Sequence, residues 1–157
     1  MLGRVTARSS LYSTEPVGYA AQPRFVNAVL ALEWDLSARA LLDALMRVER
    51  EFGRDRVNAV PNGPRTLDLD ILLFGDCVMD EPGLRIPHPR LAARAFVLEP
   101  LSEIAPEAVE PRNGATIAEL LRKLDRSATS DAVVKIGSKV RHGDAAQWMN
   151  RPRQKGL

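Results

Sequence analysis

The residues best suited to chemistry are two aspartates, Asp68 and Asp70, on alternate positions of the stretch Gly63–Phe74. Apolar and polar side chains alternate along residues 66–74, which predicts a β-strand with an apolar back and both carboxylates on the opposite face. Side chains on one face of a strand lie roughly 6.5–7 Å apart, so the two carboxylates can converge on one hard cation or bracket two. A solvated strand face carrying two charges is the competing interpretation. Arg65 and the Gly-Pro turn before it favour a site for magnesium and phosphate.

Further arginines lie in the polar loop that leads to this strand. The loop runs from Gly53 to Pro64 and carries Arg54 and Arg56. Arginine in such a loop is commonly just solvated, but a loop that enters an acidic strand can also swing over a bound polyphosphate. The sequence leaves both roles open.

An aromatic side chain and an amide share one face of a second predicted strand, Phe25–Glu33. The apolar side of that strand is formed by Val26, Ala28, Leu30 and Leu32. Phe25 and Asn27 therefore lie on the other face, where a ring and an amide can stack on a flat heterocycle and hydrogen-bond it. A cross-strand packing pair is the alternative.

Two further ionisable side chains each have two possible roles. Glu49 lies near the C-terminal end of a helix predicted over Ser37–Phe52, where the helix dipole disfavours an anion. It is either an ordinary surface residue or a ligand contact. His88 lies in the rigid corner Ile86–Pro89 and is either a capping or surface residue or a ligand contact.

The elements that must position these residues form an α+β pattern. Strands are predicted over residues 4–12, 25–33, 66–74, 77–79 (the second arm of a hairpin) and 133–136. Helices are predicted over residues 37–52, 90–101 and 116–124, the last opened by a capping box. The predicted fold is an antiparallel sheet packed with helices in an incomplete ferredoxin-like order.

Composition places the chain among ordinary globular proteins. Its 157 residues suffice for one domain with a core, which we expect over residues 1–125, followed by a basic, mobile tail over 126–157. A net charge of +2 is too small to indicate nucleic-acid binding. The single Cys77 excludes an internal disulfide and a cysteine metal cluster. No apolar run approaches the roughly 18 residues of a membrane span and no signal-peptide pattern is present, so a cytoplasmic location is expected.

Six ordered blocks make the sequence similar to the hydroxymethyldihydropterin pyrophosphokinase family of the folate pathway. The strongest is Gly63–Leu72, which resembles the family's signature strand. The others are Ser9–Thr14, Phe25–Ala28, Val48–Arg54, Ile86–Pro89 and Arg94–Leu101. The similarity runs from about Arg4 to Leu124, and blocks that match in the same order do not arise by coincidence.

The resemblance implies transfer of pyrophosphate from ATP to 6-hydroxymethyl-7,8-dihydropterin, with release of AMP. It implies ATP as co-substrate and two Mg²⁺ ions held by Asp68 and Asp70 between the ATP phosphates and the attacking hydroxyl. The partners would be these two small molecules, with neither nucleic acid nor membrane, and the chain would act as a monomer.

The resemblance also implies roles for individual residues. Family positions in catalysis match Arg54, Arg65, Asp68 and Asp70. Those that bind ATP match Glu49, Arg54, Arg56, Ile71, His88 and Arg94. Those that bind the pterin match Thr14, Val17, Phe25, Asn27 and Phe96. The two phenylalanines would sandwich the pterin ring, while the other three residues would read its hydrogen-bonding edge.

The sequence departs from the family pattern at its start, in one loop and at its end. Family members begin with a strand and a helix that have no counterpart here, so we expect a truncated chain whose sheet lacks that strand. The loop at Val60–Asn62 lacks the basic residue and tryptophan of some relatives, and the tail after Arg126 has no counterpart. The alternatives are a non-catalytic interaction domain and another two-metal nucleotidyl or phosphoryl transferase that uses the same aspartates.

Overall fold

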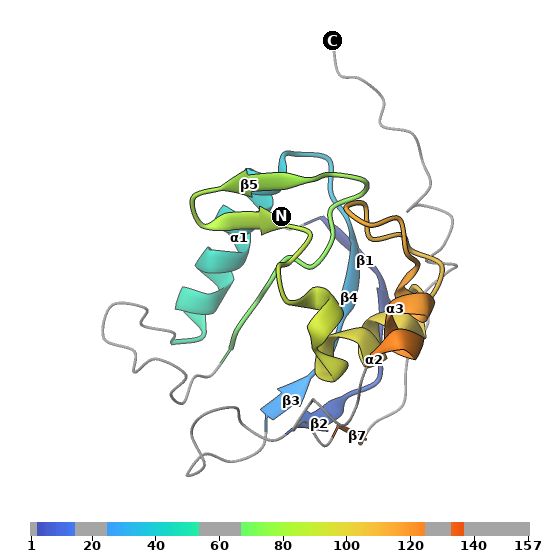
Figure 1. The fold of residues 1–157 in the computed structure, drawn as a ribbon. Coiled ribbons are helices and arrows are strands. Elements are labelled where there is room, and N and C mark those ends of the chain that lie inside the picture. Colours follow the sequence, from blue (N-terminus) through green and yellow to red (C-terminus); the bar gives the residue numbers. More distant parts are fainter. Residues whose placement is uncertain (1–2, 15–24, 54–66, 125–132, 137–157) are drawn as a thin grey trace.

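The computed structural model describes residues 3–14, 25–53, 67–124 and 133–136 (Figure 1). Most of the polar loop before the acidic stretch and most of the predicted tail lie outside these ranges. So do four residues with predicted roles: Val17, Arg54, Arg56 and Arg65.

Two small antiparallel sheets contain the strands predicted in the first part of the chain. In one, β1 (Arg4–Arg8) pairs with β4 (Leu30–Glu33). In the other, β2 (Tyr12–Thr14) lies between β3 (Phe25–Asn27) and β7 (Val134–Lys135). The strand pattern predicted at residues 133–136 is therefore confirmed, and it completes one edge of the second sheet.

Ser9 explains why each of the two long predicted strands is divided in the structure. The Ser9 N–H donates to the Val29 carbonyl oxygen at 2.9 Å, and the Val29 N–H donates to the Ser9 Oγ at 2.9 Å. A side-chain hydroxyl thus takes the place of a carbonyl acceptor, which interrupts the regular ladder at this point. The strands predicted over residues 4–12 and 25–33 are confirmed in position, each as two shorter pieces.

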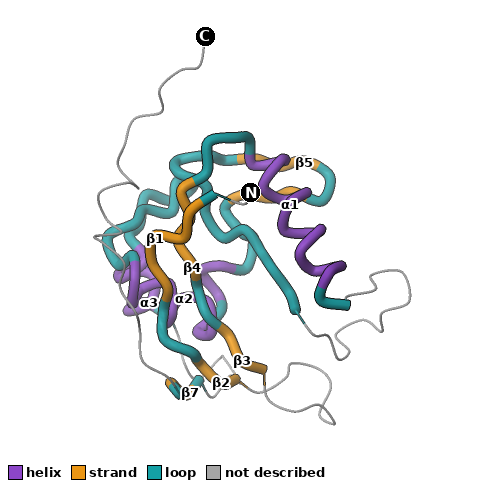
Figure 2. The backbone as a smooth tube through the Cα atoms, turned by 180° about the vertical axis from the view of Figure 1, so that it is seen from behind, coloured by secondary structure: helices purple, strands orange, loops and turns teal. Residues whose placement is uncertain are grey.

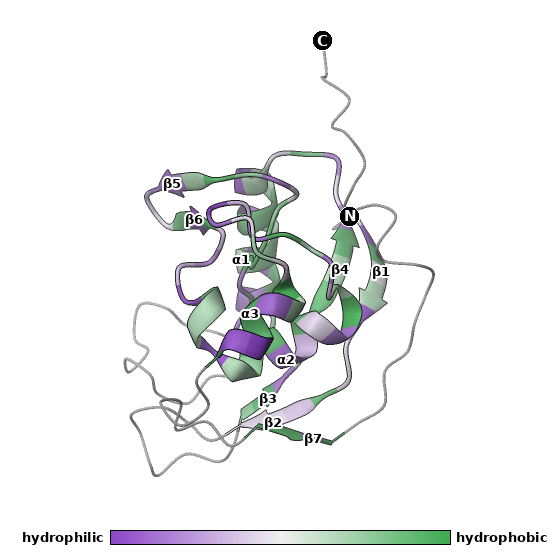
Figure 3. Ribbon diagram, turned by 45° about the vertical axis from the view of Figure 1, so that its right-hand side comes forward, coloured by the Kyte–Doolittle hydropathy of each residue, from purple (hydrophilic) through white to green (hydrophobic). Residues whose placement is uncertain are grey.

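The described helices lie at the predicted positions. They are α1 (Ala38–Glu51), α2 (Ala95–Ile104) and α3 (Ile117–Lys123), with a 3₁₀ turn (Leu91–Ala93) before α2. That turn delays the start of α2, which was predicted from residue 90. In Figure 3 much of α3 is purple, whereas β4 is mostly green.

Side-chain caps fix the starts of two helices as predicted. The Ser37 Oγ accepts a hydrogen bond from the Ala40 N–H at 3.1 Å, which opens α1. The Thr116 N–H donates to the Glu119 carboxylate at 2.9 Å, and the Glu119 N–H donates to the Thr116 Oγ1 at 3.2 Å. These two bonds form the predicted capping box of α3.

The buried face of β3 and β4 is the opposite of the predicted one. Val29 and Ala31 are buried, whereas Val26 and Leu30 are 60% and 51% exposed. The reason lies in α2, which contributes Leu98 to the core around Val29 and Ile104 to that around Ala31. The face that also carries Phe25 and Asn27 is therefore the one turned toward the helices.

The prediction of a β-strand over residues 66–74 is wrong for the part that the structure describes. Residues 67–74 pair with no strand of the described chain, and Figure 2 draws them as a loop. Alternation of side chains sets which face is buried, but a strand also requires a neighbouring backbone. Here the Leu69 N–H donates to a side chain of α1, and the Leu72 carbonyl accepts from the His88 N–H at 2.9 Å. We call residues 67–74 the acidic segment.

The hairpin predicted from residues 66–79 lies later in the chain. β5 (Met79–Glu81) pairs with β6 (Leu84–Ile86), and the turn between them is Pro82-Gly83. Gly83 has a φ of 73°, which glycine adopts without steric cost. The Cys77 N–H instead closes a turn on the Phe74 carbonyl at 3.0 Å.

Apolar packing holds the second half of the acidic segment between two clusters. Leu72 and Leu73 pack against the main core, whose buried members include Leu91, Leu98, Leu101 and Ile117. Ile71 and Phe74 pack against a second cluster, formed by Ala38, Leu84 and Ile86. The segment is thus anchored from both sides without being part of a sheet.

None of the helices described in this chain has both the length and the hydrophobicity needed to cross a bilayer.

Candidate active site

Glu49 fixes the backbone between the two aspartates. Its carboxylate accepts a hydrogen bond from the Leu69 N–H at 2.8 Å, and Glu49 itself is only 1% exposed. Asp68 and Asp70, on either side of Leu69, are exposed. The interpretation of Glu49 as a surface residue is therefore wrong. The alternation predicted for the aspartates is right, because both carboxylates point away from the packed side.

The charges that act on Asp70 come from four parts of the fold. Loss of hydration raises the pKa of Asp70, and the nearby Asp68 and Glu49 carboxylates raise it further. His88 and Arg94 oppose this rise. Charged groups of the acidic segment, of α1, of the corner at His88 and of the start of α2 therefore all act on the Asp70 carboxylate. Anions that repel in this way leave a place for a cation between them.

His88 is held in a defined orientation. Its Nδ1 accepts a hydrogen bond from the Arg90 N–H at 3.1 Å, so the neutral ring carries its proton on Nε2. Loss of hydration lowers the pKa of His88, and Arg94 and Arg90 lower it further against the opposing effect of Asp70. The ring is thus suited to donate a hydrogen bond from Nε2 as a neutral group. The bond from the Arg90 N–H confirms the capping role of His88, and the ligand contact stays a prediction.

Arg94 and Phe96 lie at the start of α2. Arg94 is the N-cap residue of this helix, and its guanidinium carbon lies 5.3 Å from the centroid of the Phe96 ring. This is a cation–π contact, so the charge and the ring hold each other in place. Arg94 also acts on Asp70, as described above, and therefore links the acidic segment to Phe96.

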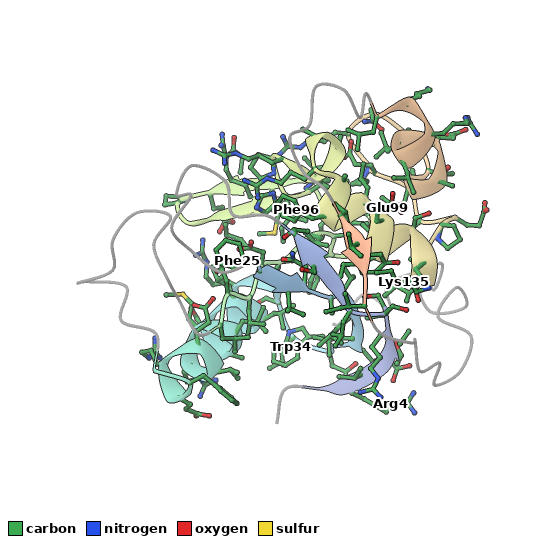
Figure 4. All side chains as sticks on the ribbon, turned by 90° about the horizontal axis from the view of Figure 1, so that it is seen from below. Arg4, Phe25, Trp34, Phe96, Glu99 and Lys135 are labelled. Carbon is green, nitrogen blue, oxygen red and sulfur yellow. The ribbon has the colours of Figure 1, made fainter. Side chains whose placement is uncertain are left out.

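Thr14 and Asn27 form a polar pair on β2 and β3. The Asn27 Nδ2 donates to the Thr14 Oγ1 at 2.7 Å, and Thr14 is only 3% exposed. Phe25 lies opposite Thr14 in the ladder and is partly buried. Helix α2 packs against both strands, and Figure 4 shows Phe25 and Phe96 on these neighbouring elements.

The carboxylates fit a magnesium site better than a cluster of protein ligands. In the described ranges, no group of three or more His, Cys, Asp or Glu residues is arranged to hold a metal. Magnesium in nucleotide sites takes one or two carboxylates and completes its shell with phosphates and water. Asp68 and Asp70 supply that number of carboxylates, and their mutual repulsion is relieved by a cation.

The remaining predicted residue, Ile71, packs into the second apolar cluster. Any contact of Ile71 with a nucleotide would therefore come from its backbone. Sequence reasoning missed Glu103 on α2. Its carboxylate accepts hydrogen bonds from Ser10, just before β2, and from Tyr12 at the start of β2. One indirect signal for Glu103 was present in the sequence. Its partners Ser10 and Tyr12 lie in the block Ser9–Thr14, yet the resemblance assigns no binding or catalytic role to either of them.

Comparison with known proteins identifies relatives of this chain. The family model for 7,8-dihydro-6-hydroxymethylpterin-pyrophosphokinase (HPPK) matches residues 1–106, about two thirds of the chain. A 2-amino-4-hydroxy-6-hydroxymethyldihydropteridine pyrophosphokinase from Pseudomonas aeruginosa is 52% identical over 118 residues, which are 75% of this chain and 71% of that protein.

Two further relatives extend the comparison. The enzyme of the same name from Synechocystis is 43% identical over 76% of this chain and 60% of its own length. The folic acid synthesis protein fol1 of Schizosaccharomyces pombe is 43% identical over 77% of this chain but only 16% of its own length. The chain thus spans less than two thirds of either of these two proteins. Since a family model covers more than half of it and several relatives exceed 40% identity, the chain belongs to the HPPK family.

Proposed function

We propose that this chain transfers the pyrophosphoryl group of ATP to 6-hydroxymethyl-7,8-dihydropterin in folate biosynthesis. The hydroxymethyl oxygen attacks the β-phosphorus of ATP, the bond from that phosphorus to the α,β-bridging oxygen breaks, and AMP leaves. The hydroxyl proton passes to solvent or a nearby base. Family membership supports this reaction. The observation that carries it is the exposed pair Asp68 and Asp70, held on either side of the partly buried bond from Leu69 to Glu49.

The acidic half of the site binds and neutralises the phosphates. Two Mg²⁺ ions held by Asp68 and Asp70 would supply charge neutralisation across the triphosphate and lower the pKa of the attacking hydroxyl. Arg94 adds fixed positive charge, and His88 donates a hydrogen bond from Nε2 to a phosphate oxygen. The remaining proposed phosphate ligands are Arg54, Arg56 and Arg65, with Glu49 and the backbone of Ile71 beside the nucleotide.

The other half of the site binds the pterin. Phe25 and Phe96 stack on its two faces, and the polar pair of Thr14 and Asn27 reads its edge together with the backbone of Val17. Positioning the hydroxymethyl group against the β-phosphorus is the main task of the protein, because phosphoryl-type transfer depends on orientation and charge more than on covalent help.

We further propose that residues 1–125 form the catalytic domain, that residues 126–157 form a basic tail, and that the chain acts as a cytoplasmic monomer on small molecules alone. An interaction domain without catalysis is the alternative from a different class. The two differ in one simple property, since an enzyme of this kind binds ATP in a magnesium-dependent way and an interaction domain does not.

The decisive experiment measures AMP release from ATP, magnesium and 6-hydroxymethyl-7,8-dihydropterin. Wild-type chain should release AMP, and Asp70→Asn should abolish turnover without lowering the thermal unfolding temperature, because this carboxylate lies outside the core and is repelled by its neighbours. Asp76→Asn is the matched control, since Asp76 is an exposed aspartate in the turn after the acidic segment. Full activity of Asp70→Asn would rule out the proposed mechanism. Absence of magnesium-dependent ATP binding by the wild type would favour the interaction domain.

A further inference from the structure

Glu103 forms a nearly enclosed polar cluster beside the residues proposed to bind the pterin. Its side chain is 9% exposed and lies near the end of α2. One carboxylate oxygen accepts from the Ser10 N–H at 3.1 Å and from the Ser10 Oγ at 2.7 Å. The other accepts from the Tyr12 hydroxyl at 2.5 Å. The Lys135 Nζ, from β7, lies 4.0 Å from the first oxygen.

The cluster is built around an ionised Glu103 and a protonated Tyr12. Burial acts to raise the pKa of Glu103, but the hydrogen bonds from Tyr12 and Ser10 and the charge of Lys135 outweigh it, and the pKa is lowered overall. Burial and the neighbouring Glu103 raise the pKa of Tyr12, so its hydroxyl keeps the proton that it donates. A buried carboxylate with several strong donors is a rigid attachment point.

This attachment point lies next to the residues that we propose to read the pterin edge. Tyr12 is directly opposite Asn27 in the ladder between β2 and β3, and Asn27 donates to Thr14 two positions along β2. A shift of β2 against α2 would therefore move both polar groups of the pair.

The same helix carries one of the two proposed stacking rings. Phe96 and Glu103 are seven residues apart on α2, which is about two turns or roughly 10.5 Å, so they lie on nearly the same helix face. Helix α2 packs against β2 and β3, and Glu103 itself bonds Tyr12 of β2. Glu103 thus ties the strand of Thr14 to the helix of Phe96.

We propose that Glu103 is a positioning residue for the pterin subsite, which sets the polar pair of Thr14 and Asn27 at a fixed place relative to the Phe96 ring. This inference rests on the proposed function. The role requires no contact between Glu103 and either substrate. Ser10 and Tyr12 are the donors that hold β2 against α2.

The test compares Glu103→Gln and Tyr12→Phe with the control Glu107→Gln, which changes an exposed glutamate just after α2. The KM for the pterin should rise roughly tenfold in the first two variants, because each loses or weakens a hydrogen bond to a charged group. The KM for ATP and kcat should stay within about twofold, since the acidic segment is untouched. The double variant should weaken pterin binding by less than the product of the single effects, because both changes act on one bond.

Equal increases in the KM for both substrates, or no increase for the pterin, would overturn the inference while leaving the proposed function intact. A separate readout keeps the inference testable if the wild type itself shows no turnover, which would count against the proposed function alone. In that case the NMR resonance of the Asn27 side-chain amide should shift in Tyr12→Phe and stay in place in Glu107→Gln. An unmoved Asn27 resonance in Tyr12→Phe would overturn the coupling.

Discussion

The acidic segment and strand β2 each receive a buried glutamate from a neighbouring helix, but the two segments differ in what else holds them. Strand β2 has ladders to β3 on one side and to β7 on the other. The acidic segment pairs with no described strand, and Glu49 bonds its backbone directly. The Glu49 side chain therefore accepts a backbone hydrogen bond from the acidic segment, whereas the backbone of β2 is held by ladders on both sides. We expect loss of Glu49 to disorganise its segment, and loss of Glu103 only to displace its strand.

Among the variants that test this comparison, Glu49→Leu should have the largest effect, because it keeps an apolar body of similar size and removes the acceptor. The Leu69 N–H would lose its partner in a partly buried place, which costs about 1–3 kcal/mol of unfolding free energy. Activity should fall by about 100-fold, because small misplacements of catalytic groups have effects of that order. Denaturant unfolding and AMP release measure the two effects.

The control for this variant is Glu51→Gln, at the exposed end of the same helix. It should change neither quantity. If Glu49→Leu kept full activity despite lower stability, the acidic segment would not depend on Glu49 for its geometry, and the comparison with β2 would fail.

Phe96→Ala should separate the two halves of the site. The ring is proposed to stack on the pterin, so pterin binding should weaken roughly tenfold while ATP binding changes little. Equilibrium binding of each ligand alone is the measurement. Phe52→Ala, which removes a 58% exposed ring at the end of α1, should affect neither. Equal losses for both ligands in Phe96→Ala would argue against the sandwich.

The cluster around Glu103 should give the protein a stability limit at each end of the pH scale. The folded pKa of Glu103 is below its usual 4.5, so its contribution is full above pH 4.5 and is lost as pH falls through the lowered value. The folded pKa of Tyr12 is above its usual 10.0, so its contribution is full below pH 10.0 and is lost as pH rises beyond that.

Two unfolding series against pH test these limits. The stability difference between wild type and Glu103→Gln should shrink below pH 4.5, and that between wild type and Tyr12→Phe should shrink above pH 10.0. Differences that stay constant across the whole range would mean that the cluster is not held by these two protonation states.

The smallest effect is expected outside both regions, at the start of α3. Thr116→Ala removes the hydroxyl that caps the Glu119 N–H and should lower the unfolding free energy by about 1 kcal/mol. Glu119→Gln keeps an acceptor for the Thr116 N–H and should cost less. Neither should change the KM for either substrate. A marked loss of pterin binding in Thr116→Ala would show that the site depends on the helices more broadly than we infer.

Much of the site could be read from the sequence because it depends on local pattern. Alternation placed Asp68 and Asp70 on the solvent side, and it put Phe25 and Asn27 on one face, since neighbouring side chains of an extended chain point in opposite directions. The capping residues Ser37 and Thr116 act on backbone only three positions away, and both were predicted. Six short blocks in a fixed order were enough to indicate the family.

Tertiary structure alone decided which partner each segment found. The acidic segment has the pattern of a strand, yet Leu69 bonds Glu49, 20 residues away on α1. Tyr12 bonds Glu103, 91 residues along the chain. Likewise, the packing of α2 against Val29 determined which side of β3 and β4 is buried. Periodicity shows that two sides of a segment differ, whereas burial and hydrogen bonding depend on what the folded chain brings against each side.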